Sequence, residues 1–434
     1  MRKRILSLLL VLVLLLSVFS LSSCNEKSLP KKVLHVYNWG QYISDGSGDL
    51  PDVNALFEAY FNEHLAEKYG FEIEVNYSTY PSNEDMYNKL VSGSASFDVV
   101  IPSDYMIEKM IEENLLLELD FSKITNYGNV AEEFRTGFAT YDPEGKYSVP
   151  YTYGTVGIIY NADYVDEEDI GSWDLLWNEK YSGKILQFNN SRDALATALY
   201  RLGYSVNTAD HAKWAEAAAL LKEQKPLVQA YVMDEIFNKM ISASAWIAPY
   251  YAGDYLTMYD SNDSLCFYIP EEGTNIFADA MCVPTCARLP EVAMEYINFM
   301  LSEEVAVANA IYIGYASPNT LVSENEDYLD EMGEFAIDLL YGKMPSEVNK
   351  AYNELIGDEN ASCYRSFEPS IQARVNTLWE NLKLANSTEV WIHVTTVIIV
   401  VLAVGLGIYT TYVKKKRSRD YRLRDKAARK SKIK

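Results

Sequence analysis

Aromatic and acidic side chains recur together in five short stretches of this 434-residue chain, and the first three stretches lie at the ends of predicted strands. An ionised carboxylate holds an ammonium group by charge-assisted hydrogen bonds, and an aromatic face covers methylene groups and attracts cations. A linear polyamine is a flexible apolar chain that carries ammonium groups, so this combination of residues predicts a site for such a ligand. The stretches are Tyr37–Tyr42, Pro102–Tyr105, Asn189–Asp193, Tyr250–Asp254 and Phe277–Asp279.

Each of these residues, taken singly, also has a structural interpretation that the sequence leaves open. Trp39 and Tyr42 are of types that often pack in a protein core. Asp193 is placed to stabilise the start of a helix, and Asp279 could be a loop carboxylate. The clustering of these residue types at successive strand ends favours the binding interpretation.

The apolar pattern predicts alternating strands and helices, which indicates an α/β architecture. The pattern extends over about 350 residues, and two lobes are expected because one core stops growing near ~250–300 residues. Ligands of open α/β sheets bind beyond the carboxyl ends of the strands, where the first three stretches lie, and the pattern of the other two suggests the same place. The strands are expected at 33–37, 71–77, 97–101, 156–160 and 185–188, and the helices at 51–65, 105–114, 192–202, 210–221, 290–301 and 302–314.

The N-terminus has the composition of a secretory signal. Arg2–Arg4 precede an apolar run that is interrupted only by serines, and residues 1–23 are therefore predicted to be a signal peptide. The ending Leu21–Cys24 resembles a bacterial lipobox, so we expect Cys24 to be lipidated and residues 24–32 to form a polar tether. A plain signal peptide or an uncleaved anchor is the alternative.

A second apolar segment lies near the C-terminus. Residues 391–413 contain no Asp, Glu, Lys or Arg, and these 23 residues reach across a hydrocarbon core of about 30 Å as a helix. The tail 414–434 carries 12 Lys or Arg against two Asp. The positive-inside rule therefore predicts a transmembrane helix with a cytoplasmic tail and with the body on the extracellular, periplasmic-equivalent side of the cell membrane.

The net charge of −23 is unevenly distributed along the chain. The basic ends leave the body with about −36, and such a body repels nucleic acid phosphates. We therefore expect no nucleic acid partner. The acidic body either suits a cationic partner or only keeps the protein soluble.

The chain has no recognisable catalytic or metal-binding motif. None of its four histidines stands at metal-ligand spacing from Cys or Glu, and it has neither a phosphate loop nor a Gly-x-Ser-x-Gly elbow. We expect no metal, no cofactor and no enzymatic activity. Four cysteines of the body allow three disulfide pairings, among which the sequence does not choose: Cys266, Cys282, Cys286 and Cys363.

Several short motifs occur in a characteristic order between Leu34 and Leu384, and the stretch Tyr77–Tyr87 is the most specific of them. The others are Tyr37–Trp39 with Tyr42, Asp98–Ser103, Ser172–Trp177, Leu202–Ser205 and Ile313–Asn319. In these residues the chain resembles the bacterial spermidine/putrescine-binding proteins of ABC importers. The resemblance implies a two-lobed, periplasmic-binding-protein-like fold of type II, in which a polyamine lies in a central cleft.

The resemblance also implies which residues contact the ligand. Tyr251 and Phe277 stand where the family has tryptophan, which keeps the aromatic faces but weakens the attraction for cations. Asp279 matches an aspartate two residues further on, and Asp193 matches a carboxylate at the start of a helix. The full expected set is Trp39, Tyr42, Ser103, Asp104, Tyr105, Asn190, Asp193, Tyr251, Phe277 and Asp279.

Two departures from the family pattern affect ligand choice. Gln41 stands where a glutamate is found, and Asn190 stands where an aspartate is found, so less charge is available for a third ammonium group. Asp104 is a candidate replacement for one lost carboxylate, and Glu368 is a candidate for a late contact. The choice between putrescine and spermidine therefore stays open.

We expect lobe 1 to comprise 33–152 and 279–320, and lobe 2 to comprise 153–278 and 321–385. A ligand that touches both lobes only when they close stabilises the closed form. The closed form would then dock on the permease and ATPase subunits of an importer. Two alternatives remain, a binding protein for another cationic amine and a membrane-bound polyamine sensor that reports to the cytoplasm.

Overall fold

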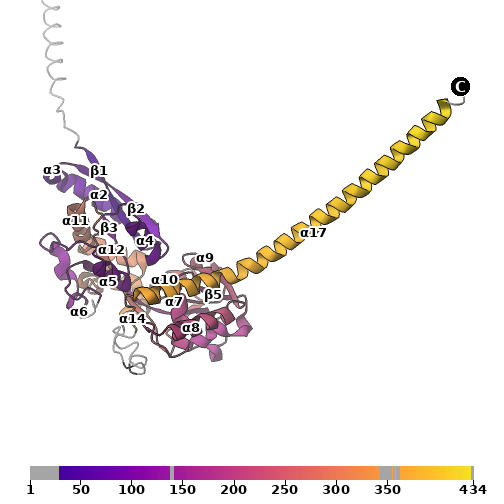
Figure 1. Cartoon of the computed structure of the whole chain (residues 1–434). Helices are drawn as coiled ribbons and strands as arrows, with labels where there is room; N and C mark the ends of the chain where they lie inside the picture. The colour runs from indigo at the N-terminus through magenta and orange to yellow at the C-terminus, as the bar shows by residue number, and fades with distance from the viewer. Residues whose placement is uncertain (1–28, 137–140, 343–353, 355–356, 358–361, 432–434) are drawn as a thin grey trace, which may run out of the picture. The chain divides into compact units, whose positions relative to one another are not determined.

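The computed structural model describes the chain except for residues 1–28, 137–140, 343–353, 355–356, 358–361 and 432–434 (Figure 1). The described residues form two compact units. The predicted signal peptide 1–23, Cys24 and the start of the tether lie outside the described residues. The first unit holds the described residues of Met1–Thr155, Tyr251–Asp260 and Ile276–Glu347, and the second holds those of Val156–Tyr250, Ser261–Asn275 and Val348–Lys434.

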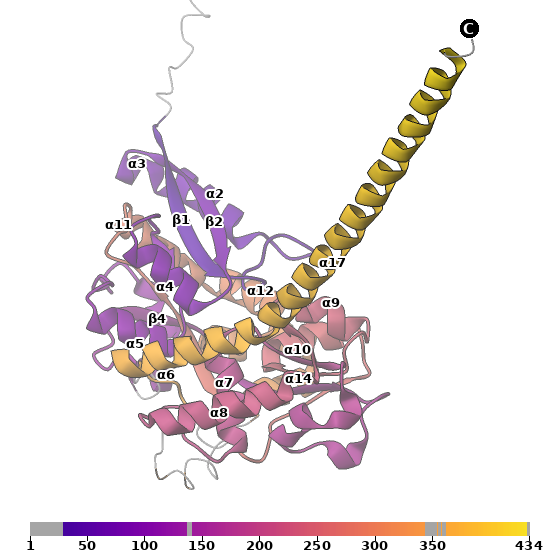
Figure 2. The same ribbon diagram turned by 45° about the vertical axis from the view of Figure 1, so that its right-hand side comes forward.

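The first unit is built on a mixed β-sheet in the order β2-β1-β3-β9-β4. Its strands are β1 (Lys31–Trp39), β2 (Glu72–Tyr80), β3 (Val99–Val100), β4 (Ser148–Asn161) and β9 (Ile276–Cys282). β1 runs parallel to β2 and β3, and both views show β1 and β2 side by side (Figures 1 and 2). β9 runs antiparallel to β3 and β4, and β4 continues beyond Thr155 into the second unit.

The helices of the first unit pack on this sheet through buried apolar residues. α2 begins after Asp52, whose carboxylate accepts hydrogen bonds from the backbone N–H groups of Asn54 and Ala55. α2 buries Phe57 and Phe61 completely and contacts β2. The helices are α2 (Val53–His64), α3 (Ala66–Tyr69), α4 (Asn83–Val91), α5 (Asp104–Glu112), α6 (Glu132–Thr136), α10 (Ala252–Tyr259), α11 (Pro290–Met300), α12 (Glu303–Ile313), α13 (Thr320–Ser323) and α14 (Glu326–Tyr341).

The second unit has a smaller set of strands with helices around them. β5 runs parallel to β6 and β7, and β8 pairs antiparallel with the second half of β4. α7 and α8 pack on each other, and Trp173 and Trp214 are buried in this unit. The elements are β5 (Ile185–Phe188), β6 (Val228–Val232), β7 (Ile247–Tyr251), β8 (Leu265–Tyr268), α7 (Ser191–Arg201), α8 (His211–Gln224), α9 (Ile236–Ile241) and α17 (Pro369–Ser431).

α17 is one continuous helix of 63 residues in the structure (Figures 1 and 2). Its first turns belong to the second unit, where they pack on α8 and α7 and bury Val375 and Trp379. Further along, Thr395–Lys416 is long and apolar enough to cross a membrane by length and composition, and it is the segment of the described chain that meets this test. It overlaps the predicted span 391–413.

The structure differs from the predicted elements at the end of the first strand and at the start of β4. The first strand extends beyond 33–37, because the parallel ladder with β2 continues to the pair Trp39–Tyr80. Trp39 therefore lies in β1 and not after it. The first half of β4 was not predicted, since Pro150 and the register shift between Pro150 and Thr152 interrupt the strand pattern. The strand at 185–188 and the helix that begins at Pro290 agree with β5 and α11.

The cysteines of the described body do not form the disulfides that their number allows. Cys266, Cys282 and Cys286 are all in the thiol form. Cys282 lies in β9, where burial raises the pKa of its thiol, so this side chain packs as an apolar core residue.

Candidate functional site

Asp279 and Tyr42 form a buried carboxylate–phenol pair in the first unit. The register of β9 and β4 places Asp279 opposite Thr152, and Tyr42 Oη donates a hydrogen bond to Asp279 Oδ2 at 2.8 Å. A short hydrogen bond also joins Tyr42 Oη to Thr152 Oγ1. Burial, followed by the negative charge of Asp279, raises the pKa of Tyr42 well above its ordinary value. The phenol therefore stays protonated at neutral pH and continues to donate to the carboxylate.

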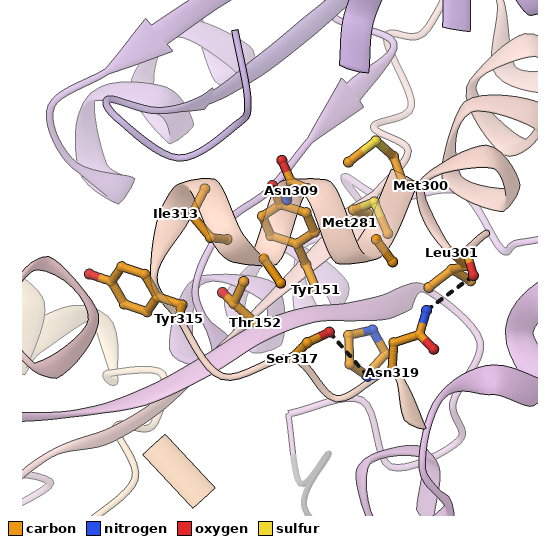
Figure 3. A pocket seen from close by; sticks show the side chains of 13 residues that line it. Tyr151, Thr152, Met281, Met300, Leu301, Asn309, Ile313, Tyr315, Ser317 and Asn319 are labelled. Carbon is orange, nitrogen blue, oxygen red and sulfur yellow. Dashed lines mark hydrogen bonds between the residues drawn. The ribbon is translucent and has the colours of Figure 1, made fainter. Parts of the chain in front are cut away.

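The loop that carries Tyr42 is held from two neighbouring elements. Tyr151 of β4 donates to the backbone carbonyl of Tyr42 at 2.8 Å. Asn309 of α12 donates to Tyr151 Oη at 2.7 Å and accepts from the backbone N–H of Ser44 at 3.0 Å. The Asn309 side chain thus links Ser44 of the loop to Tyr151, which itself binds Tyr42. Figure 3 shows Tyr151 and Asn309 next to each other.

A small cavity lies behind this network, between β4, β9 and α12 (Figure 3). It has space for about one water molecule and is therefore too small for an organic ligand. Asn319 closes part of its wall by donating to the backbone carbonyl of Leu301 at 3.0 Å, while its backbone N–H donates to Ser317 Oγ at 3.2 Å. The cavity therefore does not extend the candidate site.

Aromatic rings lie next to the carboxylate–phenol pair. Tyr315 packs edge-on against Tyr42 with 5.0 Å between ring centroids, and its centroid is 6.1 Å from that of Phe277. Tyr251 meets Phe277 in a second edge-on contact at 5.4 Å. Gly253 permits this packing, because a Cβ there would lie 2.4 Å from Cδ2 of Tyr315. The first unit thus brings flat apolar faces and a buried carboxylate together.

Ser103 and Asp104 connect the start of α5 to the strand that carries Asp279. Ser103 and Asp279 form an isolated antiparallel bridge, so the two residues are neighbours. Asp104 is buried, and its carboxylate accepts from the backbone N–H groups of Tyr105 at 2.7 Å and Ala278 at 3.4 Å. These bonds tie α5 to β9.

Trp39 and Tyr105 pack against other residues of the first unit. The Trp39 ring contacts Tyr80 with 4.6 Å between centroids, and its Nε1 is buried with no hydrogen-bond partner among the described residues. Tyr105 Oη donates to Glu84 Oε1 at 3.1 Å. The contact with Tyr80 agrees with the packing interpretation of Trp39, and a ligand contact there stays a prediction.

Asn190 and Asp193 form a reciprocal cap at the start of α7 in the second unit. Asn190 Oδ1 accepts from the backbone N–H of Asp193 at 2.8 Å, and Asn190 Nδ2 donates to Asp193 Oδ2 at 2.7 Å. Tyr364 Oη donates to Asp193 Oδ1 at 2.9 Å. Asn190 therefore caps the helix start, and the two oxygens of Asp193 are oriented by two neutral donors.

The predicted site residues divide unequally between the two units. The first unit contains eight of them: Trp39, Tyr42, Ser103, Asp104, Tyr105, Tyr251, Phe277 and Asp279. The second unit contains Asn190 and Asp193. Glu368 is exposed, and its backbone carbonyl accepts from the N–H of Ile371 in the first turn of α17.

Sequence reasoning missed four residues that contact the predicted set, Thr152, Tyr151, Tyr315 and Tyr364, and a fifth, Asn309, that contacts Tyr151. Thr152, Tyr151 and Asn309 carry no local signal, because their contacts depend on how β4, β9 and α12 pair in space. Tyr315 lies in one of the motifs of the family resemblance. Tyr364 lies four residues before Glu368, in the late stretch where the sequence offered only Glu368.

The arrangement is suited to binding a cation. Each unit holds a buried carboxylate by neutral hydroxyl or amide donors, which orient the negative charge without neutralising it, and the first unit adds aromatic faces. No group of three or more His, Cys, Asp or Glu that could hold a metal ion occurs in the part of the chain that the structure describes.

Comparison with known proteins identifies the family of the chain. The model of bacterial extracellular solute-binding proteins matches residues 59–333. The spermidine/putrescine-binding periplasmic protein of Escherichia coli is 33% identical over 287 residues, which cover 66% of this chain and 77% of that protein. The putrescine-binding periplasmic protein PotF of Escherichia coli is 28% identical over 306 residues, which cover 67% of this chain and 78% of PotF.

Solved structures agree with the sequence comparison. The substrate-binding protein PotD of a spermidine/putrescine ABC transporter from Streptococcus pneumoniae has a TM-score of 0.59 at 32% identity, and the match covers 81% of this chain and 99% of PotD. The α/β, periplasmic-binding-protein-like fold and the family resemblance expected from the sequence are thereby confirmed. The chain belongs to the bacterial extracellular solute-binding protein family.

Proposed function

We propose that this chain is a membrane-tethered extracellular binding protein that captures putrescine or spermidine and delivers it to an ABC importer. The observation that carries the proposal is the buried Asp279–Tyr42 pair with aromatic rings beside it. A carboxylate suits an ammonium group, and flat rings suit the methylene chain between ammonium groups. Relatives named for spermidine and putrescine binding support the same class of ligand.

The proposed ligand contacts are the ten residues predicted from the sequence. Asp193 and Asp279 are the carboxylates expected to hold two ammonium groups. Gln41 and Asn190 carry no charge, so the third ammonium group of spermidine would need a further acceptor, for which Asp104 is the candidate. Putrescine is therefore the ligand that this set of charges accommodates with the fewest assumptions.

Capture is proposed to occur by closure of the two lobes predicted from the sequence, 33–152 with 279–320 and 153–278 with 321–385. Their bounds differ from those of the compact units at 153–155, 251–260, 276–278 and 321–347. A ligand with contacts in both lobes stabilises the closed form by its differential affinity for the two states. A micromolar Kd requires about 8 kcal/mol, which a few charge-assisted hydrogen bonds and covered methylenes can supply after ordering costs. The closed form is then proposed to dock on the permease of an importer driven by its ATPase subunits.

The tether is proposed to have two parts. Lipidation of Cys24 would anchor the N-terminus, and the apolar segment Thr395–Lys416 of α17 would cross the membrane. Lys414–Lys416 at its end would lie on the cytoplasmic side, with the rest of the basic tail. The same topology puts the two compact units outside the membrane, where a solute-binding protein meets its ligand.

Calorimetric titration of the full-length chain in detergent tests the proposal. We expect saturable binding of putrescine or spermidine with a Kd of about 1 μM, which corresponds to about 8 kcal/mol. Glutamate, which has the wrong charge, and lysine, which has the wrong charge pattern, serve as control solutes that should not bind. Absence of binding to every diamine and triamine by protein that melts cooperatively would overturn the proposed function.

A polyamine sensor is the second candidate, and the continuity of α17 favours it. The helix runs without a break from its contacts with α7 and α8 through the apolar segment to the basic tail. Uptake of radiolabelled putrescine by cells with and without the gene separates the two functions. A transporter subunit is required for uptake, whereas loss of a sensor leaves uptake intact and changes a downstream response.

A further inference from the structure

A short segment before α17 lies across the start of α7 in the second unit. We call this segment, Cys363–Phe367, the strap. Asn207 holds its backbone by donating from Nδ2 to the carbonyl of Cys363 at 2.8 Å and by accepting from the N–H of Arg365 at 2.9 Å. Because these bonds fix two backbone groups, the strap is an ordered element although it is neither helix nor strand.

Arg192, in the first turn of α7, fastens the strap to the helix. One guanidinium nitrogen, an Nη, donates to the backbone carbonyl of Arg365 at 3.1 Å and to Asn207 Oδ1 at 3.0 Å. The guanidinium plane lies over the rings of Tyr364 and Phe367, with its central carbon 4.4 Å and 3.6 Å from the two centroids. The side chain is almost completely buried, so these contacts take the place of water around the charge.

Tyr364, in the strap, lies next to the carboxylate of Asp193, although it is 171 residues further along the chain. Tyr364 is buried, and its Oη donates to Asp193 Oδ1 at 2.9 Å. Burial and the charge of Asp193 raise the pKa of Tyr364 well above its ordinary value. Its hydroxyl is therefore a donor over the whole physiological range of pH.

We propose that Tyr364 is a positioning residue that orients the Asp193 carboxylate toward a ligand ammonium group, and that Arg192 acts through it by holding the strap. The inference rests on the proposed function and adds two residues to it. Asn190 fixes Oδ2 of the same carboxylate, so the two donors together define the plane in which the oxygens lie. A carboxylate whose plane is already fixed loses no further rotamer freedom when it accepts a hydrogen bond from a ligand ammonium group.

If Tyr364 and Arg192 shield the Asp193 charge instead, their removal should change the affinity for a cation in the opposite direction. If Tyr364 and Arg192 only reduce the negative potential at Asp193, removal of either should strengthen the binding of a cation. If they position the carboxylate, removal should weaken binding. The sign of the change in affinity therefore decides between positioning and shielding.

The test is Tyr364→Phe, which removes one hydroxyl and keeps the ring over Arg192. In calorimetric titrations of the full-length chain with putrescine, we expect Kd to rise about tenfold, the scale of one hydrogen bond to a charged group. The matched control is Tyr181→Phe, because Tyr181 is equally buried in the same unit and donates to the carboxylate of Asp169 at 2.6 Å. The control should lower the melting temperature and leave Kd unchanged. An unchanged or lower Kd in Tyr364→Phe would overturn the proposal.

A double-mutant cycle separates positioning from a general loss of stability. If Tyr364 acts through Asp193, then Tyr364→Phe should cause no further loss of affinity in an Asp193→Asn background. Additive losses would show that Tyr364 acts elsewhere and would reject the inference. If the wild-type chain binds no polyamine, the proposed function fails instead, so the two failures are distinguishable.

Arg192→Lys tests whether Arg192 acts by holding the strap. Lysine keeps the positive charge but lacks the planar fork that bonds to the strap and lies over its rings. We expect Kd for putrescine to rise about fivefold in a variant that still melts cooperatively, a smaller effect than the loss of Tyr364 Oη. A wild-type Kd in Arg192→Lys would show that the charge alone matters and would remove Arg192 from the proposal.

Discussion

The two carboxylates of the candidate site, Asp279 and Asp193, are held by different kinds of structure. Asp279 lies inside β9, where the ladder with β4 fixes its backbone and Tyr42 donates to its side chain. Asp193 lies in the first turn of α7, where Asn190 and Tyr364 donate to its two oxygens. One carboxylate is therefore placed by a sheet, and the other by a helix cap and a strap.

Their electrostatic surroundings differ as well. Asp193 lies in the first turn of α7, near the positive end of the helix dipole, which reduces its negative potential. The Asp279 carboxylate accepts from the hydroxyl of Tyr42, which carries no charge. We infer that the first unit supplies most of the attraction for a cation, and that the second unit supplies geometry.

The largest effect is expected from Asp279→Asn. The substitution keeps the shape but removes the charge, so the ligand ammonium loses its buried counter-ion and binding should weaken by ~2–5 kcal/mol. Calorimetric titration with putrescine measures the loss. Asp98→Asn is the matched control, because Asp98 is a buried carboxylate of the same unit that accepts from the backbone N–H groups of Arg288 and Leu289 at 2.7 Å. The control should lower stability without a change in affinity, and wild-type affinity of Asp279→Asn would reject the assignment of Asp279.

The next effect is on the stability of the first unit. Gly253→Ala places a Cβ 2.4 Å from the Tyr315 ring, which packs on both Tyr42 and Phe277. The ring has to move, and the free energy of unfolding should fall by ~1–3 kcal/mol, as for other overpacked cores. Gly128→Ala is the control, since a Cβ there meets no atom within 4 Å. If urea unfolding of the two variants is the same, the ring packing does not depend on Gly253.

A smaller loss of affinity is expected from Asp193→Asn, about 1–2 kcal/mol, because the positive end of the α7 dipole already offsets part of the charge that the substitution removes. The control Asp210→Asn changes another aspartate at a helix start of the second unit, where the Asp210 side chain accepts from the N–H of Ala212. It should leave affinity for putrescine unchanged. A loss in Asp193→Asn as large as that in Asp279→Asn would contradict the proposed division of roles between the units.

The two carboxylates also differ in how far the sequence could predict their surroundings. The cap of Asn190 and Asp193 spans three residues, and such local patterns are visible in a sequence because the partners lie within one helical turn. The partner of Asp279 is Tyr42, 237 residues away, so only the family motifs pointed to both. Tyr364 and Asn309 were missed for the same reason, since nothing local to either residue indicates its partner.

The fold was predictable to the extent that it repeats simple patterns. β5 and the start of α11 followed from an apolar run and from a proline at the first helical position. The first half of β4 did not follow, because Pro150 and a register shift interrupt it and its neighbour β9 comes from elsewhere in the chain. Local sequence patterns thus predict many of the strands and helices, whereas the candidate site depends on contacts between these elements.

The smallest effect concerns the phenols that hold the two carboxylates. Burial and a neighbouring carboxylate raise the pKa of both Tyr42 and Tyr364 above the ordinary value near 10. Above pH 10 the unfolded chain loses these protons while the folded chain keeps them, so each phenol contributes stability below pH 10 that is lost as the pH rises. Each proton corresponds to a slope of about 1.4 kcal/mol per pH unit in the free energy of unfolding.

Urea unfolding of the full-length chain between pH 9 and pH 11 measures this slope, with the pH range chosen around the ordinary tyrosine pKa of about 10. Tyr42→Phe and Tyr364→Phe should each reduce the slope by one proton, and the double variant should reduce it by two because the residues lie in different units. A wild-type slope in either single variant would mean that its phenol ionises equally in the folded and unfolded chain. The carboxylate beside that phenol would then lose its hydroxyl donor at alkaline pH. Its contact with putrescine would weaken, whereas the contact of the other carboxylate would not change.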